Sequence, residues 1–69
     1  MFILVTSTVG ELDAQKFDEY DKAIEHLETE YFNTLTENEY IEEAFFDRNE
    51  YFYIRNQFDE EYIGKLIQI

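Results

Sequence analysis

Cysteine is absent from the 69 residues of this chain. Its absence excludes disulfide bonds, thiol catalysis and zinc sites built from cysteine ligands. A secreted domain of this size usually needs such cross-links. The composition therefore favours a reducing compartment, and we expect a cytoplasmic protein.

Long hydrophobic runs are absent too. The apolar start, residues 1–5, is too short for the core of a signal peptide and has no basic residue before it. No apolar run approaches the roughly 18 residues that a membrane-spanning helix needs. We therefore expect no targeting segment and no membrane span.

Basic residues are few, and acidic residues dominate. Lysine and arginine total 5, aspartate and glutamate total 17, and the formal net charge is −12. The five cations are scattered along the chain: Lys16, Lys22, Arg48, Arg55 and Lys65. Phosphate contacts need clustered Lys and Arg, and an anionic membrane repels a chain of this charge. The sequence therefore disfavours direct binding to nucleic acid or to lipid.

Catalytic and metal-binding motifs are also missing. The single histidine, His26, has carboxylates nearby but lies off the apolar side of its predicted helix, without a second histidine or a nucleophile. Adjacent carboxylates such as Glu60 and Glu61 are plentiful, but a chain this short does not build the deep cleft that glycosidase chemistry needs. We expect no enzymatic activity, no metal and no cofactor.

Aromatic residues are abundant, with seven Phe and six Tyr. Such side chains bury roughly 150–250 Å² each when packed, which favours a folded chain despite the high charge. The length fits one compact domain over residues 1–69. A single core is marginal at this size, so self-association through an aromatic surface or a free strand edge, as in a homodimer, stays an alternative.

Hydrophobic periodicity organises the first half of the chain. Residues 1–10 carry no charge and are apolar on both alternating sides, which is typical of a buried strand inside a sheet. Residues 12–31 place large apolar side chains at spacings of 3 and 4, which predicts one long amphipathic helix that ends near Asn33. These side chains are Phe17, Tyr20, Ile24, Leu27 and Tyr31.

Residues 36–47 allow two interpretations. Thr36 and Glu39 fit a capping box and favour a short helix. As a strand, the segment puts one Glu on each face, which is a poorer pattern. Residues 47–50 are typical of a turn between two aromatic-rich strands.

Two strands are expected in the last third. Residues 51–55 are rich in aromatic side chains, and a polar connection over 57–61 leads to a second strand over 62–69. One face of that strand carries isoleucines with a lysine between them: Ile63, Lys65, Ile67 and Ile69. The sequence therefore predicts an α+β fold, with a small antiparallel or mixed sheet and one long helix packed across it. Residues 36–47 add a second short helix under the first of their two interpretations.

Acidic residues form the most informative pattern. Four carboxylates spaced 3, 4 and 3 form one stripe on the predicted helix, away from the apolar stripe: Asp18, Asp21, Glu25 and Glu28. At about 1.5 Å per residue they carry roughly one charge per 4–5 Å, against one per about 3.4 Å along a DNA strand. Residues 37–47 add a second acidic segment that contains Glu42 and Glu43 and no cation.

Two interpretations of this acidity compete. The acids keep a small aromatic-rich protein soluble, or they imitate phosphates and occupy the basic site of a nucleic-acid-binding protein. A charge of −12 exceeds the magnitude of about 2–8 that solubility asks of a small domain. The acids also stand in runs without interspersed cations, so the second interpretation leads.

In its small size, lack of cysteine, strong acidity and aromatic richness, the chain resembles the phage-encoded DNA-mimic inhibitors. This group includes anti-CRISPR proteins, anti-restriction proteins and inhibitors of uracil-DNA glycosylase. The resemblance is one of character over the whole chain, without an aligned motif. It implies a non-enzymatic phage or mobile-element protein in the host cytoplasm. Its partner is then a basic nucleic-acid-binding host protein, such as a CRISPR effector, a restriction enzyme or another DNA enzyme.

Partner-binding residues are expected from these patterns. The electrostatic part of the contact is assigned to six acids: Asp18, Asp21, Glu25, Glu28, Glu42 and Glu43. Tyr40, Tyr51 and Tyr53 are candidate anchors at its centre, where buried aromatic rings supply much of the affinity. Core packing is the alternative role for each tyrosine. The alternative function is an acidic structural or adaptor module for protein–protein interaction, as a monomer or a dimer.

Overall fold

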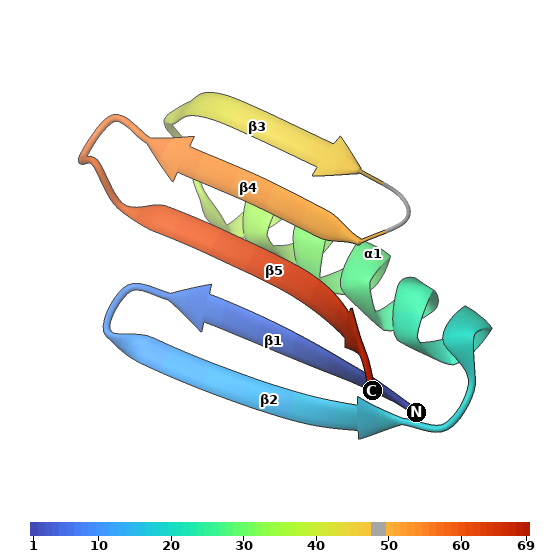
Figure 1. Cartoon of the computed structure of the whole chain (residues 1–69). Coiled ribbons are helices and arrows are strands. Elements are labelled where there is room, and N and C mark those ends of the chain that lie inside the picture. The colour runs from blue at the N-terminus through green and yellow to red at the C-terminus, as the bar shows by residue number, and fades with distance from the viewer. Residues whose placement is uncertain (48–49) are drawn as a thin grey trace.

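One long helix packs across a five-stranded antiparallel sheet in the computed structural model, which describes residues 1–47 and 50–69 (Figure 1). The elements follow the chain in this order: β1 (Phe2–Thr8), β2 (Glu11–Phe17), α1 (Tyr20–Glu37), β3 (Ile41–Asp47), β4 (Tyr51–Asn56) and β5 (Glu61–Gln68). The strands lie side by side in the order β2-β1-β5-β4-β3. The last strand therefore lies in the middle of the sheet, and the predicted α+β class is confirmed.

The uncharged N-terminal segment forms β1, an interior strand that pairs with β2 on one side and with β5 on the other. Leu4 on this strand is buried in the core. Gly10 closes the hairpin to β2 with a φ of +77°, which residues with a Cβ rarely adopt. The predicted strand inside the sheet is confirmed, but among its residues only Leu4 is buried, because the helix covers one face of the sheet.

The helix predicted over 12–31 begins later, because residues 11–17 form strand β2. The turn at Gly10 folds this segment back along β1, where each of its seven residues has a pairing partner. The interstrand hydrogen bonds formed in this way outweigh the helical spacing of Phe17 and Tyr20. The first part of the predicted helix was therefore wrong.

The helix also continues past Asn33, where we expected its end, to Glu37. Asn38 follows it, and its Nδ2 donates a hydrogen bond of 2.8 Å to the carbonyl oxygen of Thr34. That carbonyl belongs to the last turn, where acceptors lack partners within the helix. The side-chain amide of Asn38 therefore caps the C-terminal end.

The core lies between α1 and the sheet. Its buried apolar residues are Ala23 and Leu27 of the helix and Leu4, Phe52, Ile54 and Leu66 of β1, β4 and β5. Ile24 and Tyr31 flank this contact and are half-buried, which confirms the middle of the predicted apolar stripe. Its beginning was wrong: Tyr20 is 42% exposed, and Phe17 packs against the core from the end of β2.

Of the two interpretations of residues 36–47, the favoured short helix is wrong, because residues 41–47 form strand β3. The expected capping box at Thr36 does not form. Thr36 lies in the last turn of α1, and its Oγ1 donates a hydrogen bond to the carbonyl oxygen of Phe32. The hydroxyl therefore serves the end of one helix instead of the start of another.

A β-bulge accommodates the adjacent acids Glu42 and Glu43 in strand β3. The register shifts between Ile41 and Glu43, where β3 pairs with β4. A bulge breaks the strict alternation of side chains between the two faces of a sheet. Glu42 and Glu43 then both reach Arg55 on the neighbouring strand, which removes the objection to a strand here.

The strands predicted over 51–55 and 62–69 are confirmed as β4 and β5. The turn predicted at 47–50 includes residues 48 and 49, which lie outside the described residues. Where β4 and β5 pair, the ring of Phe52 lies over Gly64, and a Cβ at Gly64 would overlap it. Glycine is therefore the residue that lets this ring reach the core.

Buried Asn56 ties the turn between β4 and β5 to the end of the helix. Its Oδ1 accepts hydrogen bonds from the backbone N–H groups of Phe58 and Glu60, at 2.9 and 3.1 Å. Its Nδ2 donates to the Glu60 carboxylate at 2.8 Å and to Asn38 Oδ1 at 3.2 Å. The buried amide is thus fully paired, as stable folds require.

We expect Leu27→Ala to lower the free energy of unfolding by about 2–5 kcal/mol, because it removes a fully buried side chain and leaves a cavity. Phe32→Ala removes a larger side chain from the same helix, but one that is 53% exposed, and should lower it much less. Urea unfolding followed by circular dichroism measures both. Equal losses would contradict the core face assigned to α1.

Candidate functional site

The sheet has two unlike faces. The helix α1 covers one of them, and we call the other the open face (Figure 1). Alternate residues of a strand point to opposite faces, and Leu4, Phe52 and Leu66 point towards the helix. The pairing register therefore assigns these residues to the open face: the odd-numbered residues of β1, β4 and β5, the even-numbered residues of β2, and Glu43, Phe45 and Asp47 of β3.

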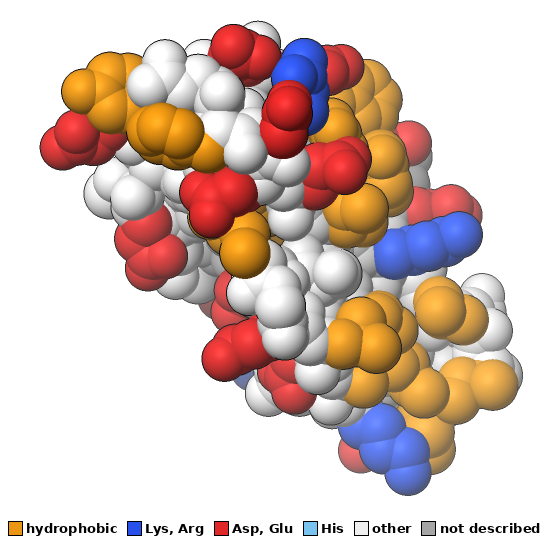
Figure 2. Space-filling view, turned by 90° about the vertical axis from the view of Figure 1, so that its left-hand side faces the viewer, with side chains coloured by type: hydrophobic (Ala, Val, Ile, Leu, Met, Phe, Trp, Pro, Cys, Tyr) orange, Lys and Arg blue, Asp and Glu red, His pale blue; other side chains and the backbone are white. Residues whose placement is uncertain are grey.

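The open face is largely apolar and aromatic. One row crosses all five strands in register: Leu12, Ser7, Ile63, Tyr53 and Phe45. A second row places Ala14, Val5, Lys65 and Tyr51 beside it. Figure 2 shows hydrophobic side chains gathered along one side of the molecule, with Lys and Arg side chains among them.

Charge is divided unequally between the two sides of the molecule. The open face carries three of the four described cations, Lys16, Arg55 and Lys65, and three acids, Glu43, Asp47 and Glu61. The other 14 of the 17 acids belong to the opposite strand faces, the helix and the connections, although two of them, Glu42 and Asp59, also reach Arg55. Lys22 on α1 is the fourth described cation, so the helix side is strongly negative and the open face carries a much smaller excess of acids.

The solvent side of α1 forms what we call the acidic helix surface: Asp21, Glu25, Glu28, Glu30 and Glu37. Asp21, Glu25 and Glu28 share one side of the helix, as their spacing predicted. Asp18 does not join them, because it lies in the bend before the helix begins. Like charges at these spacings destabilise a helix by about 0.2–0.5 kcal/mol per pair.

Few of these carboxylates have partners. Glu30 lies 3.4 Å from Nε2 of His26, one turn earlier on the helix. Over residues 1–47 and 50–69 the structure shows no ion pair for Asp21, Glu25 or Glu28. Their charges therefore remain available to an external cation.

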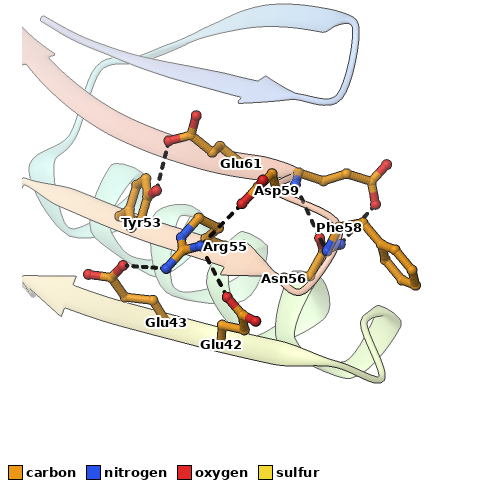
Figure 3. A network of polar contacts seen from close by, with 9 residues as sticks. Glu42, Glu43, Tyr53, Arg55, Asn56, Phe58, Asp59 and Glu61 are labelled. Atoms are coloured by element: carbon orange, nitrogen blue, oxygen red, sulfur yellow. Dashed lines mark hydrogen bonds and ion pairs between the residues drawn. The ribbon is translucent and has the colours of Figure 1, made fainter.

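Glu42 and Glu43 differ, because the fold brings a cation to them (Figure 3). Nη1 of Arg55 lies 3.1 Å from Glu42 and 3.2 Å from Asp59, and Nη2 lies 3.5 Å from Glu43. These atoms belong to β3, β4 and the turn that follows β4. The acidic segment that lacked a cation in sequence is thus partly neutralised in space.

The three predicted tyrosines lie in two places. Tyr51 and Tyr53 are half-buried on the open face, where the ring of Tyr51 lies 6.0 Å from that of Phe45. Tyr40 lies before β3 and packs edge to face with Phe58, with ring centroids 6.2 Å apart. The nine predicted site residues therefore do not form one surface, since these tyrosines and the acids of α1 belong to different sides.

Sequence reasoning missed two features of these surfaces. Arg55 lies 12 and 13 residues after the two acids that it contacts on β3, and no local sequence pattern predicts contacts at such separations. Phe45 as part of an apolar face was missed because its segment was taken for a helix. The alternation of Ile63 and Ile67 around Lys65 was visible, and it was the one signal for an exposed apolar strand face.

A shallow hollow of about 560 Å³ lies where β2 meets the start of α1. It brings Asp18 and Glu25 together with Lys16, Lys22 and His26. The His26 ring packs on Phe17 at 5.3 Å. Cations and carboxylates are mixed here, so the lining favours no ligand of one sign.

Among the described residues, no cluster of His, Asp and Glu fits a metal ion. None of the helices in this part of the chain is long and apolar enough to span a membrane. Comparison with protein-family models, curated proteins and solved structures found no match to the chain. The functional proposals below therefore rest on the geometry and charge of this chain alone.

We expect added salt to stabilise the isolated protein. Seventeen acids against five cations repel one another in the folded state, and the Debye length falls to about 8 Å at physiological ionic strength. The melting temperature should therefore rise from low to physiological NaCl concentration. A fall would show that attractive pairs such as those of Arg55 dominate the electrostatics.

Tyr53 should titrate later than an ordinary tyrosine. Its hydroxyl donates a hydrogen bond of 2.7 Å to Glu61, and this bond raises the pKa of Tyr53 above 10.0. The stabilisation from this bond is therefore complete below the unfolded pKa and is lost as the pH rises through the folded pKa. Glu61→Gln should bring the pKa of Tyr53 back towards its ordinary value.

Absorbance of tyrosinate during an alkaline titration measures this shift, and Tyr53→Phe assigns the signal to one ring. Glu50→Gln is the matched control, since Glu50 is an exposed acid outside the strand pair that holds Tyr53 and Glu61. Identical titrations of both glutamine variants would contradict the assigned hydrogen bond.

Proposed function

We propose that this protein is a small acidic, non-enzymatic inhibitor that occupies the basic nucleic-acid-binding site of another protein. Its carboxylates take the positions of phosphates. The observation that carries this proposal is the acidity of α1 and its flanks, since residues 18–39 contain eight acids and one lysine. In the described chain only one of these acids, Glu30, has an ion-pair partner. Unpaired like charges oppose folding, which favours a role for them in binding.

The side of α1 that carries Asp21, Glu25 and Glu28, which we call the docking side, also carries an aromatic ring. Asp21, Glu25, Glu28 and Phe32 follow one another at spacings of 4, 3 and 4, so they share one side of α1. Phe32 is 53% exposed. We assign it the anchoring role first expected of the tyrosines, because Tyr51 and Tyr53 lie on the open face.

The mechanism is competition. Long-range attraction guides the acidic helix surface to a basic cleft and raises the association rate by about 10–10³. Burial of the Phe32 ring and desolvated charge pairs then slow dissociation. Nucleic acid is excluded because the same cations hold both ligands. The candidate targets are host proteins such as a CRISPR effector, a restriction enzyme or another DNA enzyme, reached in the host cytoplasm.

A capture experiment tests the competition directly. The immobilised protein is exposed to a nuclease-treated bacterial lysate, and bound proteins are eluted with duplex DNA or with polyglutamate of equal charge. We expect DNA to elute a basic nucleic-acid-binding protein at lower concentration than polyglutamate does. A bound protein that DNA fails to displace would favour the adaptor function instead.

Charge reversal on α1 should weaken inhibition more than reversal elsewhere. Asp21→Lys with Glu25→Lys changes the net charge from −12 to −8 and breaks the docking side. Asp13→Lys with Glu50→Lys makes the same change of charge at exposed residues on β2 and beside β4. We expect the helix pair to dissociate from the captured protein at least tenfold faster, since buried charge pairs act mainly on that step.

The measurement is how strongly each double variant inhibits DNA binding by the captured protein. It distinguishes docking through α1 from an effect of overall charge. Equal losses would remove α1 from the interface and leave only overall charge. No loss in either variant would overturn the mimic proposal.

The alternative function, a structural or adaptor module, is favoured by a different observation. The open face exposes apolar and aromatic side chains over five strands, and such patches are typical of protein–protein contacts. Acidity then serves solubility alone. The capture experiment separates the two functions, because DNA competes only for a partner that the acidic helix surface binds.

A further inference from the structure

We infer that the open face of the sheet is covered by a second copy of this chain, so that two sheets pack face to face with their helices outside. This inference is independent of the inhibitor function. Its first basis is exposure, since Leu12 is 77%, Phe45 54% and Ile67 43% exposed on this face. A contiguous apolar patch of this extent is unusual on a monomer.

Charge selects the occupant. Two copies with a net charge of −12 repel each other through any surface that carries the excess acids. The open face carries the smallest excess of acids, because it holds three of the four described cations, Lys16, Arg55 and Lys65. Its strands contribute three acids, and Glu42 and Asp59 reach Arg55 as well. A two-fold arrangement brings the same patch of both copies together, so the face with the smallest excess of charge is the one that two copies can share.

Polar contacts within the open face already engage two of its acids in the monomer. Glu43 is held by Arg55, and Glu61 accepts the hydrogen bond of Tyr53. The charge of Glu43 is therefore partly neutralised, and one carboxylate oxygen of Glu61 has a hydrogen-bond donor, before any contact. Ile3, Val5, Ile63 and Ile67 occupy the centre around Lys65, whose aliphatic stem adds apolar surface.

The area of the face fits a stable dimer. The Cα envelope measures 35 × 21 × 15 Å, and a sheet and a helix layer about 10 Å apart fit its shortest dimension. The broad face is therefore at most roughly 700 Å² per copy, of the same order as the roughly 800 Å² per partner of a standard interface. Two such sheets pack about 10 Å apart, with the acidic helix surfaces left free on the outside.

Mass measurement tests the dimer. Sedimentation or light scattering of the full chain across micromolar to millimolar concentration should give twice the monomer mass of 8.4 kDa. Added NaCl should favour the dimer, because it screens the repulsion between copies. A chain that keeps the mass of 8.4 kDa at every concentration and salt level overturns the inference.

Two matched pairs of variants locate the interface. Phe45→Glu and Phe32→Glu change the same residue type at nearly equal exposure, 54% and 53%, on the open face and on α1 respectively. Lys65→Glu and Lys22→Glu make the same charge reversal on those two sides. We expect Phe45→Glu and Lys65→Glu to raise the dimer dissociation constant about tenfold or more. Their partners on α1 should leave it within a few fold.

The variants also separate the dimer from the inhibitor function. Phe32→Glu should impair inhibition and leave the dimer intact, whereas Phe45→Glu should do the reverse. Circular dichroism confirms that each variant is folded before its mass is measured. A dimer that survives both open-face variants would place the contact at a strand edge and overturn the inference. Equal weakening by both members of a pair would do the same.

Discussion

The fold depends on one constraint: a single helix must provide the core for five strands. The helix has 18 residues, so it is about 27 Å long and about 10 Å wide. A sheet of five strands at about 4.8 Å spacing is roughly twice as wide as the helix. The helix therefore lies along the middle of the sheet, where Ala23 and Leu27 meet Leu4 and Ile54. Only the middle of one face is covered, and the two edge strands, β2 and β3, and the whole opposite face remain accessible.

The charge distribution is consistent with this one-sided architecture. Acids concentrate on α1 and its flanks, and three of the described cations lie on the uncovered sheet face. Acids interspersed among Ile3, Val5 and Ile63 would keep that face solvated and open. Because acids are absent from its centre, this face is poorly hydrated, although the chain as a whole has a net charge of −12. Solubility explains neither the size of the excess charge nor the placement of the 17 acids.

The sequence predicted the fold class and the strands of both ends, because those signals are local. The uncharged residues 1–10 and the aromatic run 51–55 were recognised by strand patterns that need no distant partner. Strand β2 was missed because a single turn at Gly10 decided its pairing against a helical spacing. Strand β3 was missed because its two adjacent acids fit only with a bulge and with Arg55 opposite. The predicted acidic stripe of α1 was correct for Asp21, Glu25 and Glu28 and wrong for Asp18, which lies before the helix. The open face was not predicted, because it depends on the pairing register between strands, which alternation within one strand does not determine.

The two faces constrain each other. An acidic helix surface prevents association through α1, since two such surfaces repel within a Debye length of about 8 Å at physiological salt. Association is then directed to the less acidic open face, the reverse of the side for which we propose contact with a basic cleft. A dimer formed there carries two acidic helix surfaces on opposite sides, separated by two sheet layers and two helix layers of about 10 Å each. Such a particle presents to basic sites two negative surfaces facing opposite ways, and each stays free while the other is bound. Self-association through one face and charge-driven binding through the other are therefore compatible in a chain of 69 residues.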